Sequence, residues 1–146
     1  MAKFPKEVLE HFRRVPLFAH VSERGLRAVV SAADELDEPA GKALVREGDH
    51  GRELFVLTSG SARVTRQGRE LAMLGPGDFF GEIALLAGGP RTATVTAESD
   101  VAVMILTPRQ FETVLDSERS VRRAVLQALG ERLPAEEDGP QATDDS

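Results

Sequence analysis

Turn-forming residues divide the middle of this chain into many short segments. Between residues 34 and 106, runs of roughly five residues alternate with Gly, Pro and Asp, the punctuation that is typical of short strands joined by tight turns. Many strands in so short a stretch favour a barrel, because closing a sheet removes its exposed edges. The sequence therefore predicts a jelly roll or a related β-barrel. Its candidate strands are 34–39, 43–46, 53–58, 61–66, 69–74, 92–97 and 101–106.

Helical periodicity flanks this predicted barrel on both sides. Apolar residues recur at helical spacing in 5–15, and after a break at 15–18 a second helix begins behind an N-cap at Ser22. Beyond the barrel, Thr107 and Pro108 suit the N-cap and first residue of a third helix, and a last helix is predicted near 118–133. The predicted fold class is therefore mainly β, a jelly-roll β-barrel with N-terminal and C-terminal helices.

The negative charge of the chain is concentrated at its end. The net charge is −6, but the segment after Leu133, PAEEDGPQATDDS, holds five of the 24 acidic residues and no basic one, which leaves 19 acids against 18 Lys and Arg. A nearly neutral body argues against binding to nucleic acid, which needs a concentrated positive field. We predict one domain over 1–133, with its barrel at about 34–106, and a disordered acidic tail over 134–146.

Several classes of function lack the residues that they need. The chain has no cysteine, and His11, His20 and His50 are scattered without metal-ligand spacing, so we predict no metal site. Ser22, Ser59 and Ser61 have no recognisable His–Asp partners, so we predict no catalytic residues and do not expect an enzyme. No apolar run could span a membrane and no secretory signal is visible, so we expect a cytoplasmic location.

One segment departs from the strand pattern. Residues 79–95 read FFGEIALLAGGPRTATV, and here a one-turn helix over 82–86 separates two β-like runs. The helix start at Gly81 would present unpaired N–H groups to an anion. Arg91 carries a planar fork that suits phosphate oxygens, and Glu82 offers a carboxylate to sugar hydroxyls. This segment predicts a pocket for a phosphate and a ribose.

The same segment closely resembles the phosphate-binding cassette of the cyclic-nucleotide-binding domain family. That family includes the regulatory subunits of cyclic-nucleotide-dependent kinases, cyclic-nucleotide-gated channels and catabolite activator-type regulators. Further matches are Val45-Arg46-Glu47-Gly48-Asp49, the run FVLTSGS at 55–61 and the run GPGDFFGE at 75–82. Together with Pro16-Leu17-Phe18, the resemblance covers roughly residues 16–130.

The resemblance implies a role for individual residues. Glu82 is expected to bind the ribose 2′-hydroxyl and Arg91 the cyclic phosphate. Backbone amides are expected to complete the phosphate site, and two apolar strand residues to wall the base. The residues concerned are Gly81, Ile83, Ala84, Thr92 and Ala93 for the phosphate site, and Val64 and Leu71 for the base. The ligand is expected to be cAMP or cGMP with no other cofactor; Thr92 leaves the base open, with a slight preference for cAMP.

We therefore expect a cyclic-nucleotide receptor whose C-terminal helices move on binding and regulate a protein effector or a homodimer. Leu126 and Leu129 are candidates to cover the base. Two alternatives stay open: an interaction domain of the same fold with a vestigial pocket, in which Glu82 and Arg91 pair with each other, and, ranked last, a cupin-type enzyme.

Overall fold

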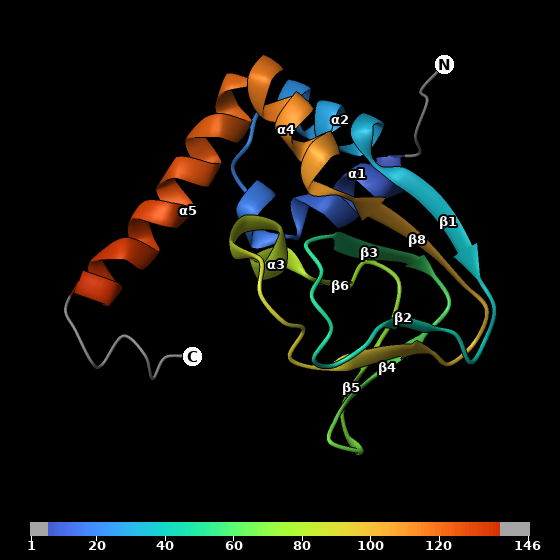
Figure 1. Ribbon diagram of the computed structural model, residues 1–146. Helices are drawn as coiled ribbons and strands as arrows, with labels where there is room; N and C mark the ends of the chain where they lie inside the picture. The colour runs from blue at the N-terminus through green and yellow to red at the C-terminus, as the bar shows by residue number, and fades with distance from the viewer. Residues whose placement is uncertain (1–5, 138–146) are drawn as a thin grey trace.

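A computed structural model describes residues 6–137, with side chains described through Gly130. Eight short strands form two antiparallel four-stranded sheets that face each other as a barrel (Figure 1). One sheet has the order β1-β8-β3-β6 and the other β2-β7-β4-β5. The strands are β1 (Asp34–Glu38), β2 (Ala43–Val45), β3 (Leu54–Ser59), β4 (Ala62–Arg66), β5 (Arg69–Leu74), β6 (Phe79–Phe80), β7 (Thr94–Ala97) and β8 (Val101–Leu106).

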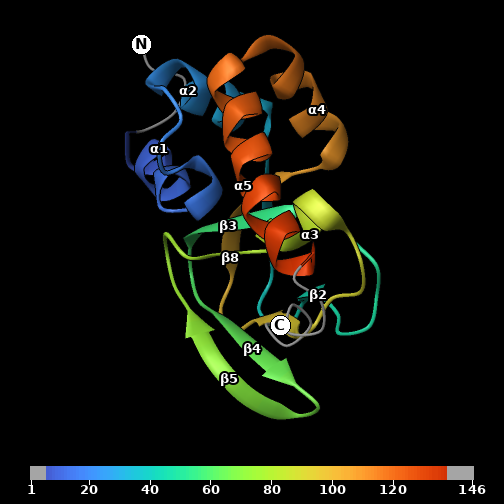
Figure 2. The same cartoon turned by 90° about the vertical axis from the view of Figure 1, so that its left-hand side faces the viewer.

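The helices gather at one end of this barrel (Figures 1 and 2). Before the strands come α1 (Lys6–Arg13), the 3-10 helix η1 (Pro16–Phe18) and α2 (Glu23–Ala32); after them come α4 (Pro108–Ser117) and α5 (Arg119–Glu137). The short helix α3 (Glu82–Ala87) is inserted between β6 and β7. Figures 1 and 2 show α5 running from the helical end of the molecule past α3.

Two hydrophobic clusters hold these layers together. The larger cluster joins the helices to the outer side of the β3–β8 sheet, and three phenylalanine rings lie at its centre. Phe18 stacks on Phe12 at 6.4 Å between ring centroids and meets Phe111 edge-on at 6.2 Å. The smaller cluster fills the barrel between the two sheets and includes Phe55, Leu57 and Val103. The helical layer is therefore part of the same packed domain as the barrel.

Local capping explains where two of the helices begin. The Ser22 hydroxyl accepts from the N–H of Gly25 at the start of α2. At the start of α4, the Thr107 hydroxyl accepts from the Gln110 N–H, and the Gln110 side chain accepts from the Thr107 N–H. Both N-caps predicted from the sequence are confirmed.

The predicted fold class is correct, and the differences from the structure are one missed strand and several element boundaries. Strand β6 was not among the candidates, because two residues are too few to show an alternating pattern. The candidate strand at 92–97 begins only at Thr94. The last helix continues past 133 to Glu137 and so takes in the first four residues of the expected tail. Residues 138–146 of the expected disordered tail lie outside the described residues, so the division into domain and tail stays a prediction.

Candidate functional site

The site is built where α3 interrupts the sheet pattern. Gly81 is the N-cap of α3 and has φ +92°, a left-handed conformation that disfavours any residue with a Cβ. A Cβ at this position would also overlap the carbonyl oxygen of Glu53 and lie 2.9 Å from Nη1 of Arg91. The predicted helix is confirmed, and the close approach of Glu53 and Arg91 gives a second reason for glycine at its start.

A pocket of about 440 Å³ lies between α3, the β4–β5 hairpin and the segment that leads into β7. All nine residues predicted from the sequence line this pocket. They are Gly81, Glu82, Ile83 and Ala84 from the start of α3, Arg91, Thr92 and Ala93 after the glycine turn, and Val64 and Leu71 from the hairpin. The structure therefore brings together side chains from three separate segments. Arg66, Val45 and Val95 add to the same lining.

Arg91 is the most buried polar side chain of this lining. Only 7% of its side chain is exposed, and its Nη2 donates to the carbonyl oxygen of Glu53 at 3.2 Å and to the Glu53 carboxylate at 3.0 Å. Its guanidinium lies 5.8 Å from the ring centroid of Phe55, which stacks on Phe80. The main chain of Arg91 is also held, since its N–H donates to Asp49 and its C=O accepts from Gly48.

Glu82 connects the pocket to the helical layer. Its Oε2 accepts a hydrogen bond of 2.8 Å from the backbone N–H of Leu17, in η1. Leu17 is buried in the larger hydrophobic cluster, and η1 packs against α5. The residue expected to bind a ribose is therefore also a contact between α3 and the N-terminal helices.

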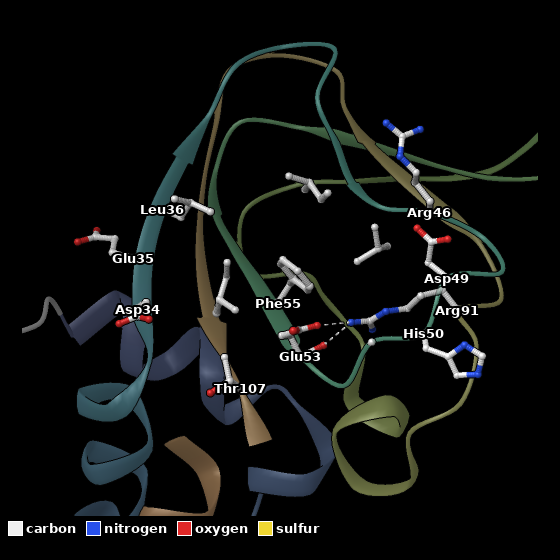
Figure 3. Close-up of a pocket in the computed structure, with 14 residues that line it drawn as sticks. Asp34, Glu35, Leu36, Arg46, Asp49, His50, Glu53, Phe55, Arg91 and Thr107 are labelled. Carbon is white, nitrogen blue, oxygen red and sulfur yellow. Dashed lines mark hydrogen bonds and ion pairs between the residues drawn. The ribbon is translucent and has the colours of Figure 1, made fainter. Parts of the chain in front are cut away.

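A second cavity lies on the other side of Arg91 (Figure 3). It has a volume of about 670 Å³ and opens between β1, β2 and β8. Glu53 and Gly51 line this cavity and not the first one, whereas Arg91 lines both. Figure 3 shows the Arg91 side chain reaching across to Glu53, which immediately precedes β3. Arg91 is thus a shared wall between the two cavities.

Sequence reasoning missed Glu53, Gly51 and the Leu17 N–H. A Cβ on Gly51 would lie 2.8 Å from Nη2 of Arg91 and 3.1 Å from Oε1 of Glu53, so this glycine leaves room for the ion pair. The only available signal was the stretch GDHGRE at 48–53, a glycine-rich turn that ends in an acid just before β3. Nothing in that pattern says which cation the acid would meet.

The candidates for covering the base lie elsewhere in this structure. Leu126 is 69% exposed on α5, and neither it nor Leu129 lines the pocket. No residue of α5 with a described side chain lines it. Leu71 and Ile83 lie at the edge of the pocket with more than half of their surface exposed, so the pocket is open to solvent beside these two residues.

No group of three or more His, Asp or Glu side chains among the residues that the structure describes is placed to hold a metal ion. None of the helices in that part of the chain is long and apolar enough to cross a lipid bilayer.

Fold and pocket together define a ligand-binding barrel with a buried arginine at its site. A family model described as cyclic nucleotide-binding domain matches residues 37–118. The chain belongs to the cyclic-nucleotide-binding domain family, as the resemblance in the sequence implied.

Individual relatives span several kinds of protein. The N-terminal domain of a transcriptional regulator from Streptomyces coelicolor is 34% identical, with a TM-score of 0.75, and the match covers 88% of this chain and 96% of that one. The regulatory domain of Toxoplasma gondii PKA, solved with cAMP, is 33% identical with a TM-score of 0.64, over 77% of this chain and 46% of that one. A cGMP-dependent protein kinase from Toxoplasma gondii is 36% identical over 79% of this chain, which spans only 12% of the kinase.

Proposed function

We propose that this domain binds cAMP or cGMP in the pocket beside α3 and passes the binding event to its C-terminal helices, which regulate a protein effector or a second copy of the chain. The observation that carries the proposal is the convergence of all nine expected residues on one pocket, with Arg91 buried in its wall. Family membership supports the ligand class, and a relative solved with cAMP supports a cyclic nucleotide as the ligand.

The phosphate is assigned to Arg91. Its guanidinium is nearly withdrawn from solvent, and a charged hydrogen bond strengthens where water is excluded. Gly81 lies directly beside Nη1, so a phosphate oxygen there would meet both the guanidinium and the backbone at the start of α3. The ribose 2′-hydroxyl is assigned to Glu82, and the base to the apolar surface of Val64 and Leu71 on the hairpin.

Coupling to the helices is assigned to Glu82 and η1. A hydroxyl that donates to the Glu82 carboxylate shares it with the Leu17 N–H, and this changes the contact that joins α3 to η1. Helix α5 packs on η1 and forms a groove of about 420 Å³ with η1 and α3. A ligand shifts such a contact only by its differential affinity for the two arrangements. Hydrogen exchange with and without nucleotide should therefore change in η1 and α5, and stay constant in β1 and β8.

Calorimetric titration tests the binding itself. The wild-type domain, titrated with cAMP and with cGMP, should bind at least one of them, and Arg91→Ala should weaken that binding by about 2 kcal/mol, roughly thirtyfold. Arg69→Ala is the matched control, because Arg69 starts β5 outside the pocket and carries the same charge. Absence of heat with both nucleotides, with an unchanged melting temperature, would leave the vestigial-pocket interaction domain as the better explanation.

The choice of base is tested at Thr92. This residue lies at the edge of the pocket, where a hydroxyl could donate to the phosphate or contact a guanine amino group. If Thr92 selects guanine, Thr92→Ala should weaken cGMP binding and leave cAMP binding within about twofold. An equal loss for both nucleotides would assign its hydroxyl to the phosphate that they share.

A further inference from the structure

We infer that Glu53 is a positioning residue for Arg91, holding the guanidinium from behind so that its opposite edge faces the ligand. The inference rests on the proposed function, because it concerns how the phosphate-binding side chain is aimed. Glu53 lies at the end of the turn before β3, 38 positions from Arg91, and supplies both its carbonyl oxygen and its carboxylate to one nitrogen of the guanidinium, Nη2.

The two cavities show why Glu53 supports Arg91 rather than blocking it. Glu53 lines the cavity between β1, β2 and β8, and not the nucleotide pocket. Nη2 is turned toward Glu53, while Nη1 lies beside Gly81, which lines the nucleotide pocket. A phosphate can therefore approach one edge of the fork while Glu53 keeps the other. Figure 3 shows this rear contact from the side of the second cavity.

Gly51 and Gly81 flank the guanidinium of Arg91, and a side chain at either position would crowd it. A Cβ on Gly51 would lie 3.0 Å from Nε, and a Cβ on Gly81 would lie 2.9 Å from Nη1. The main chain of Arg91 is fixed at the same time by hydrogen bonds to Gly48 and Asp49. With the main chain held at one end and Nη2 held at the other, the long side chain is ordered before any ligand arrives, so less conformational entropy is lost on binding.

Glu53 also balances the charge of Arg91 before a ligand binds. A buried guanidinium without a partner is strongly unfavourable, and the Glu53 carboxylate supplies that partner. The Glu53 side chain is 40% exposed, so water screens much of its negative charge and reduces its repulsion of a phosphate on the far side. Hydrogen bonding to Arg91 is therefore the property on which ligand capture depends, more than the charge of Glu53.

Titration of cAMP and cGMP into two Glu53 variants separates these properties. Glu53→Ala removes the side-chain acceptor and should weaken nucleotide binding about tenfold, equivalent to about 1.4 kcal/mol. Glu53→Gln keeps an oxygen acceptor and removes the charge, so its affinity should be equal to or higher than that of wild type. Glu35→Ala is the matched control: it removes a carboxylate from the same cavity, and Figure 3 shows Glu35 pointing away from Arg91. Its affinity should match wild type.

A ligand-free measurement checks that the effect runs through Arg91. The Nε–H signal of Arg91 in NMR spectra should be sharp and slow to exchange in wild type and Glu53→Gln, and broadened or fast to exchange in Glu53→Ala. If Glu53 served stability alone, Glu53→Ala and Glu53→Gln would both lower the melting temperature, and the two variants would not differ in nucleotide affinity.

Four results would overturn the inference. They are wild-type affinity in Glu53→Ala, an equal loss in Glu53→Gln, an equal loss in Glu35→Ala, and an Arg91 signal that Glu53→Ala leaves unchanged. If wild type itself binds neither nucleotide, the proposed function fails and this inference fails with it. Strong binding by wild type together with any of the four results refutes the inference alone.

Discussion

Replacing Gly51 with alanine tests the position of Arg91 without touching either charged residue. The new Cβ would lie 2.8 Å from Nη2 and 3.1 Å from Oε1 of Glu53. Ordinary van der Waals separations are about 3.5 Å, so the guanidinium must retreat by roughly 0.7 Å. That retreat stretches a hydrogen bond that is now 3.0 Å long to about the outer limit for such bonds. We expect a loss of about 1.5 kcal/mol in nucleotide binding, which is roughly tenfold.

The free energy of unfolding should change much less than the affinity. Gly51 is not among the residues with positive φ, and the atoms nearest to the new Cβ belong to side chains and not to the backbone, so the fold can accept a methyl group. Alanine also restricts the unfolded chain, which offsets part of any strain by about 0.4–1 kcal/mol. Urea denaturation of the ligand-free protein should therefore show a change within about 1 kcal/mol of wild type.

Gly75→Ala is the control for this experiment. A Cβ on Gly75 would meet nothing within 4 Å, and this residue also lies outside the positive-φ set. Both variants are titrated calorimetrically with cAMP and cGMP, and Gly75→Ala should bind like wild type. Wild-type affinity in Gly51→Ala would refute the reasoning, because it would mean that a displaced guanidinium serves the ligand equally well.

Three other substitutions test separate parts of the structure. Glu82→Ala should lower the free energy of unfolding of the ligand-free protein by about 1 kcal/mol, because the Leu17 N–H loses an acceptor, and it should also weaken nucleotide binding. An unchanged free energy of unfolding in urea would contradict the contact between Glu82 and Leu17. Thr107→Ala should cost about 1 kcal/mol in the same unfolding assay, through loss of the α4 capping box, with nucleotide affinity unchanged. Phe18→Ala should cost about 3–5 kcal/mol, because its fully buried ring packs on Phe12 and Phe111; a loss below about 1 kcal/mol would contradict that packing.

Local signals account for what the sequence could predict. Turn glycines separate the strands, and side-chain caps at Ser22 and Thr107 mark where α2 and α4 begin, so these features depend on residues only a few positions apart. The pocket lining was predictable through the spacing of the 79–95 segment and its resemblance to a family. Strand β6 was missed because its two residues are assigned by pairing with β3, which lies more than 20 positions earlier in the chain.

Contacts between distant segments could not be predicted in the same way. The β1–β2 side of the barrel carries many acids, and composition does not show which of them reaches inward to Arg91. Glu53 does so because β3 begins beside the start of α3, which the antiparallel pairing of Phe55 with Phe80 brings about. The partner of Arg91 is therefore a consequence of strand register, and register is a property of the folded sheet.

Arg91 has to be stable in its buried position whether or not a ligand is bound. A resemblance between sequences predicts which group the arginine would bind, but it does not explain how a guanidinium with 7% of its side chain exposed is stabilised before a ligand binds. Burial of an unpaired guanidinium would oppose folding, whereas an equally buried carboxylate partner would hold it too tightly and repel the phosphate. A half-exposed carboxylate on the far side satisfies both requirements, since it pairs with the cation while water screens it. Glu53 has the position and exposure that this requires, so the stability of Arg91 before a ligand binds depends on a residue that does not line the pocket.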